Sequence, residues 1–93
     1  MIGKISNFYE RLVLDRLYRI HAERPGAPLD EDTVHDLACI ALNRLPPRYA
    51  RHSVDLAAHL TEEEWLAADD AVAEAIDFAL ATLRRRSQSR ADE

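Results

Sequence analysis

Three arginines, a tyrosine and a histidine stand close together between residues 44 and 52, and no acidic residue occurs between Asp36 and Asp55. Arginine pairs bidentately with phosphate and with the O6 and N7 atoms of guanine, a carboxylate can accept from guanine N1 and N2, and tyrosine can stack on a base. These residue types match the recognition chemistry of a guanine nucleotide. The candidate ligand-binding residues are Asn43, Arg44, Arg48, Tyr49, Arg51, His52 and Asp55.

The chain around this basic segment is acidic, since its 93 residues carry a formal net charge of -5. A basic segment in an acidic chain indicates a small anionic partner, and the overall acidity argues against direct DNA binding, because duplex affinity comes mostly from basic groups. Two interpretations stay open. On a helix, Arg51 and Asp55 would share a face, either to bind a ligand or to pair with each other. Asn43 either contacts the ligand or holds the end of the preceding helix.

Pro46 and Pro47 place this basic segment at a corner of the chain. Pro47 restricts Pro46 to extended geometry and neither ring can donate a backbone hydrogen bond, so the helix that leads into Leu45 must end there. A stiff corner holds guanidinium groups with less ordering entropy to lose when a ligand binds.

A first helix is expected to begin at Asn7, whose side chain can cap it while Glu10 reaches back in a capping box, and to end at residue 23 or 24. Its apolar surface is wide and comprises Phe8, Tyr9, Leu12, Val13, Leu14, Leu17, Tyr18 and Ile20. Such a surface fits either a second subunit or a helix fully enclosed within a monomer.

Two further helices flank the corner. Asp30 can cap a helix that ends at Pro46, and Thr61 with Glu64 forms a capping box at the start of the longest helix. Residues 53–60 fit a short helical segment or an irregular connection. Only two glycines occur, and β-branched residues are scattered. The sequence therefore predicts an all-α, single-domain bundle of three main helices plus a short helical segment, with a domain over residues 1–86 and a flexible tail over 87–93.

Other residues with chemical potential have simpler explanations. His35 and Cys39 are four apart but supply only two zinc ligands, so Cys39 is expected to pack as a small hydrophobe; the alternative is a zinc site completed at a subunit interface. Asp69, Asp70 and the arginines at 84–86 are expected on solvated helix surface. No nucleophile elbow or glycine-rich phosphate loop is present. We therefore expect no enzymatic activity, no metal site and no cofactor.

The cellular location follows from composition. A single cysteine excludes an internal disulfide and indicates a reducing compartment. The N-terminus lacks a secretory pattern, and no apolar run approaches the roughly 18 residues that a membrane span needs. The expected location is the cytoplasm, without membrane association.

The run Ala41-Leu42-Asn43-Arg44-Leu45-Pro46-Pro47-Arg48-Tyr49 resembles the hallmark of the ComFB family, the late competence development proteins. Residues 7–13 are similar to that family's opening Asn-x-Tyr-Glu-x-Leu-Val. Residues 48–56 look like its proteobacterial branch, which continues Arg-Tyr-x-Arg-His-x-Val-Asp. The similar stretches therefore lie at the beginning and at the end of the first half of the domain.

The resemblance implies a small helical homodimer that acts as a receptor for cyclic dinucleotides, notably cyclic di-GMP. Competence, motility and biofilm formation are expectations inherited from the same family. Bacillus-type members carry zinc-binding cysteines before the second helix, whereas residues 29–36 of this chain contain none. The structural zinc is therefore expected to be absent.

Two hypotheses result. In the first, a non-enzymatic homodimer binds cyclic di-GMP through Arg44, Arg48 and Arg51, and signals to an unknown downstream protein. Asp55 would read guanine N1 and N2, and Tyr49 or His52 would stack. In the alternative, a structural or adaptor dimer binds an acidic protein segment without nucleotide.

Overall fold

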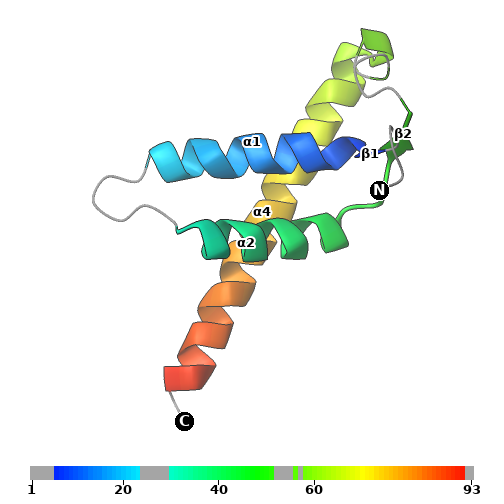
Figure 1. Cartoon of the computed structure of the whole chain (residues 1–93). Helices are drawn as coiled ribbons and strands as arrows, with labels where there is room; N and C mark the ends of the chain where they lie inside the picture. The colour runs from blue at the N-terminus through cyan, green and yellow to red at the C-terminus, as the bar shows by residue number, and fades with distance from the viewer. Residues whose placement is uncertain (1–5, 24–29, 52–55, 57, 92–93) are drawn as a thin grey trace.

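The computed structural model describes residues 6–23, 30–51, 56 and 58–91. Three helices form the body: α1 (Phe8–Ala22), α2 (Glu31–Arg44) and α4 (Glu62–Ala91). Figure 1 shows α1 and α2 side by side across α4, which extends beyond both of them. The described residues Leu56, Ala58 and His59 are also helical. The predicted all-α class with three main helices is confirmed.

A two-stranded antiparallel pair joins the start of α1 to the corner after α2. Strand β1 (Ser6–Asn7) pairs with β2 (Tyr49–Ala50), in the register Ser6 with Ala50 and Asn7 with Tyr49. The sequence analysis did not anticipate this pairing, because each strand has only two residues and carries no alternating pattern.

The helix starts follow the predicted caps with one difference. Asp30 Oδ1 accepts from the Thr33 amide at 2.7 Å, and Asn7 Oδ1 accepts from the Tyr9 amide at 3.1 Å. The expected return bond from Glu10 is not formed; that side chain is exposed, and Asn7 itself lies in β1. The cap of α1 is therefore a single side-chain acceptor rather than a capping box.

Helix α4 begins with the reciprocal capping box that the sequence predicts. The Glu64 amide donates to Thr61 Oγ1 and the Thr61 amide donates to Glu64 Oε1, both at 3.1 Å. At the other end the structure differs from the expected flexible tail, because α4 continues through Ala91. Residues 87–91 contain neither glycine nor proline, and extending a formed helix is much easier than starting one.

The core lies where the three helices meet. Its most deeply buried large side chains are Val13, Leu17, Leu37, Val72 and Ile76. Alanines of α2 and α4 are fully buried beside them, namely Ala41, Ala75 and Ala79, and such small side chains let helix backbones approach closely. No polar or charged residue of the described part of the chain is buried.

Two further predictions, the packing of Cys39 and the lack of a membrane span, can be compared with the described residues. Cys39 is exposed, so the expectation that it packs as a hydrophobe is wrong; at its position on α2 the side chain points away from the core. None of the described helices combines the length and apolar composition that crossing a bilayer requires.

Candidate ligand-binding corner

The corner is the segment from Asn43 to Arg51. Leu45 ends α2 with extended backbone, at φ -79° and ψ 144°, while its amide still donates to the Ala41 carbonyl at 3.1 Å. The Leu45 side chain is buried, whereas Pro46 and Pro47 are exposed. The prolines therefore end the helix as predicted, and a buried leucine anchors the turn.

Asn7 fastens the corner to the start of α1. Its Oδ1 accepts from the Arg48 amide at 3.2 Å as well as from the Tyr9 amide, and the Phe8 amide donates to the Arg48 carbonyl at 2.6 Å. From its position in the sequence, Asn7 is predicted only to cap α1. Its second partner is 41 residues away, which no local pattern indicates.

Arg48 is half-buried against aromatic surface. Its guanidinium carbon lies 5.7 Å from the centroid of the Phe8 ring, which itself packs against Trp65 at 5.8 Å between ring centroids. The pKa of Glu64 is lowered chiefly by the hydrogen bond from the Thr61 amide, with a smaller contribution from the positive charge of Arg48. The Arg48 side chain therefore extends from the corner over Phe8, close enough to the first turn of α4 for its charge to act on Glu64.

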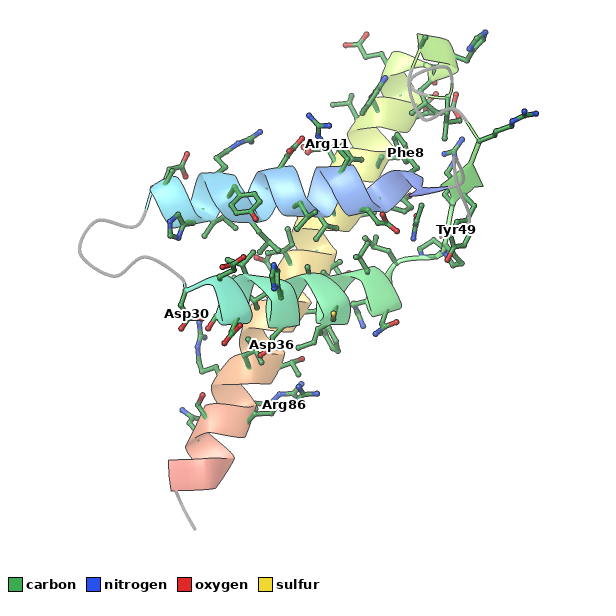
Figure 2. All side chains as sticks on the ribbon, in the orientation of Figure 1. Phe8, Arg11, Asp30, Asp36, Tyr49 and Arg86 are labelled. Atoms are coloured by element: carbon green, nitrogen blue, oxygen red, sulfur yellow. The ribbon has the colours of Figure 1, made fainter. Side chains whose placement is uncertain are left out.

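Tyr49 and Arg51 are both exposed side chains of the corner. Tyr49 is 66% exposed, and Figure 2 labels it at the end of the molecule where the two strands pair. A hollow of about 360 Å³ lies beside it, lined by Asn7, Glu10, Leu42, Asn43, Leu45, Pro47 and Tyr49. Arg51 is also exposed and forms no ion pair with any described residue.

Arg44 faces α4 instead of this hollow. Its Nε lies 2.9 and 3.0 Å from the two Glu74 carboxylate oxygens and its Nη2 lies 2.7 Å from Oε1, while the guanidinium sits 4.1 Å from the Phe78 ring centroid. The hydrogen bond from Arg44 lowers the pKa of Glu74 and raises that of Arg44. Arg44 thus ties the end of α2 to α4.

The structure separates the predicted site residues into groups. Asn43 and Tyr49 line one hollow, Arg48 lies against Phe8, and Arg44 is held by Glu74. His52 and Asp55 lie outside the described residues, so the predicted relation of Arg51 to Asp55 is not described either. The described residues contain no group of three or more histidine, cysteine or acidic side chains placed to hold a metal ion.

A second hollow, the α2–α4 groove, contains residues that the sequence analysis treated as solvated helix end. It measures about 490 Å³ and is lined by Ile40, Asn43, Arg44, Phe78, Thr82, Arg85 and Arg86. Asn43 lines both hollows. The only local signal for this groove is the helical spacing of Phe78, Thr82, Arg85 and Arg86, which places them on one side of α4.

These features define a small all-α domain in which a Pro-Pro corner is clamped to the start of the first helix. The family model described as late competence development protein ComFB matches residues 6–87. The chain therefore belongs to the ComFB family, as the resemblance of its motifs implies. Among curated proteins, none matches this chain.

Proposed function

We propose that this protein is a non-enzymatic receptor for a cyclic dinucleotide, cyclic di-GMP, that signals from the cytoplasm to a downstream protein as a homodimer. The observation that carries the proposal is the exposed Tyr49 ring beside a hollow, with Arg51 two residues further along the chain and without an ionic partner among the described residues. An aromatic face and a free guanidinium suit a guanine base and a phosphate.

Each residue of the corner has a distinct role in this proposal. Tyr49 stacks on one guanine, while Arg51 and Arg48 contact phosphate or a guanine edge. Asn43 donates to the ligand from the end of α2. His52 and Asp55 keep the roles that the sequence suggests: His52 stacks on a base, and Asp55 accepts hydrogen bonds from guanine N1 and N2. Arg44 acts in this site only through the geometry of α2, because its guanidinium is already paired.

Rigidity supports the proposal as well. The Asn7 side chain holds the Arg48 amide and the pairing of β1 with β2 holds Tyr49, so the backbone of the corner is already ordered and loses little entropy when a ligand binds. The dimer has weaker support: Tyr18 on α1 and Leu66 on α4 are large apolar side chains that remain exposed at 53% and 61%. A second subunit would cover such surface.

Isothermal titration calorimetry with cyclic di-GMP, cyclic di-AMP and GTP tests the proposal, with sedimentation velocity to determine the oligomeric state. We expect saturable heat with cyclic di-GMP, weaker binding of cyclic di-AMP because adenine lacks the O6 acceptor, and a dimer. A folded dimer that gives no heat with any of the three nucleotides would reject the proposal.

The alternative function is an adaptor dimer whose corner binds an acidic protein segment. It uses the same arginines, since carboxylate and phosphate both accept bidentate bonds from guanidinium. Substitution of Arg51 and Asp55 with folding intact separates the two. Loss of nucleotide binding favours the receptor, whereas unchanged nucleotide behaviour with loss of a protein partner favours the adaptor.

A further inference from the structure

The α2–α4 groove has a floor and a rim of different chemistry. Ile40 and Phe78 are half-buried and supply apolar surface, while Arg85 and Arg86 are exposed. Figure 2 labels Arg86 on the part of α4 that extends past α2. The groove therefore offers apolar contacts on one side and positive charge on the other.

The positive charge of this groove comes from α4. The Arg44 guanidinium is neutralised by Glu74, so it adds little net charge. Arg85 Nη2 donates to Thr82 Oγ1 at 3.3 Å, and no carboxylate in the described part of the chain lies within ion-pair distance of Arg85 or Arg86. Asp36 lines a neighbouring hollow together with Arg86 but does not form an ion pair with it. Two exposed arginines that form no ion pair with a described carboxylate, in an acidic protein, indicate an anionic occupant.

The apolar floor favours a protein segment over a nucleotide. The Phe78 ring already carries the Arg44 guanidinium on one face at 4.1 Å, so that face cannot stack on a base. The groove is open to solvent along the two helices, which suits a segment that lays aliphatic side chains on Ile40 and Phe78 and carboxylates on the arginines.

The acidic half of α4 in a second copy is the other candidate occupant. Glu64, Asp69 and Glu74 already have partners within the same chain, so pairing two copies through these three carboxylates would break existing bonds. The other four carboxylates of residues 62–77 form no ion pair with any described residue. A segment of a different protein would break no such bond, and the experiment below distinguishes it from a second copy.

We propose that the α2–α4 groove is a docking surface for an acidic, amphipathic segment of a partner protein. The groove is distinct from the corner hollow and shares only Asn43 with it, so this inference stands whether or not the corner binds a nucleotide. Arg85 and Arg86 pair with the carboxylates of the segment, and Ile40 and Phe78 contact its apolar face.

The test measures fluorescence anisotropy of a labelled amphipathic helical peptide that contains leucine and glutamate at helical spacing. The full chain is titrated without nucleotide, and a leucine–lysine peptide of the same pattern serves as the matched probe. We expect the leucine–glutamate peptide to bind, and the double variant R85E/R86E to bind it about tenfold or more weakly, because two attractions become repulsions. The leucine–lysine peptide should not bind.

The matched control is R11E/R19E, which makes the same change in net charge on exposed positions of α1. This control should bind the leucine–glutamate peptide as the wild type does, and circular dichroism should show that both variants keep their helical content. Equal binding by R85E/R86E and the wild type, or no binding by the wild type, would overturn the proposal. The proposal would also be overturned if only R85E/R86E lost the dimer, because the groove would then bind a second copy. Loss of cyclic di-GMP binding by R85E/R86E with peptide binding intact would overturn it as well.

Discussion

Arg44 and Arg51 belong to the same basic segment, yet the structure gives them opposite surroundings. Arg44 is held by three hydrogen-bond contacts to Glu74 and lies over Phe78, whereas Arg51 is exposed and has no ion pair among the described residues. Arginines that are clustered in the sequence therefore do not form one site. Part of it connects two helices, and part of it remains available to a ligand.

The difference between the two arginines is tested by removing each one separately and measuring cyclic di-GMP binding by calorimetry. R51A should weaken binding about tenfold to a hundredfold, because a bidentate arginine contact is worth roughly 1–3 kcal/mol. R44A should leave the affinity within about a factor of two. Its effect should appear in the urea midpoint of unfolding, which decreases as the α2–α4 tie is lost.

The opposite pattern would remove the distinction between the two arginines. If R44A abolished nucleotide binding while R51A did not, Glu74 would have to release Arg44 to the ligand. R19A is the matched control, because Arg19 is an exposed arginine of α1 outside both hollows.

Asn7 offers the next largest effect, this time on stability. N7A removes the acceptor for both the Tyr9 and the Arg48 amides, so the cap of α1 and the clamp on the corner are lost together. We expect the free energy of unfolding to fall by about 1–2 kcal/mol, measured by urea denaturation. D30A is the control, since it removes a cap bond far from the corner.

Hydrogen exchange distinguishes the two consequences of N7A. Protection of the Phe8 amide, which donates to the Arg48 carbonyl, should decrease in N7A and stay unchanged in D30A. Unchanged protection in N7A would mean that the strand pairing, rather than Asn7, holds the corner.

The smallest expected effect is the pH dependence of the stability that the ion pair between Arg44 and Glu74 contributes. The hydrogen bond from Arg44 lowers the pKa of Glu74 below its ordinary value of 4.5 in the folded state. Because the pKa of Glu74 is lower in the folded state than in the unfolded state, the ionised carboxylate stabilises the fold at a pH above its ordinary pKa. This stabilisation is lost as the pH falls below the ordinary pKa, because the unfolded chain then binds the proton more readily. The contribution is small, since both side chains are exposed.

Urea midpoints measured from neutral pH down to about pH 3 test this sign. The wild type should exceed E74Q at neutral pH, and the difference should shrink as the pH falls below 4.5. A difference that stayed constant with pH would assign the effect of E74Q to packing rather than to charge.

Local chemistry determined much of the fold. Asn7 and Asp30 cap their helices, Thr61 and Glu64 form their capping box, and the two prolines end α2, because each signal acts within about four residues of chain. The same locality explains two misses. Cys39 lies one helix position away from the buried stripe and is exposed, and the polar end of α4 stays helical because nothing in it breaks a helix.

The candidate site depended on contacts between distant residues. The charge pattern and the proline geometry are properties of the chain, so the presence of several arginines at a stiff corner could be predicted from them. Which of these arginines stays available could not be predicted, because Glu74 is 30 residues from Arg44 and Asn7 is 41 residues from Arg48. The packing of α2 across α4 also brought Arg85 and Arg86 to the groove, where helix packing rather than sequence spacing sets their neighbours.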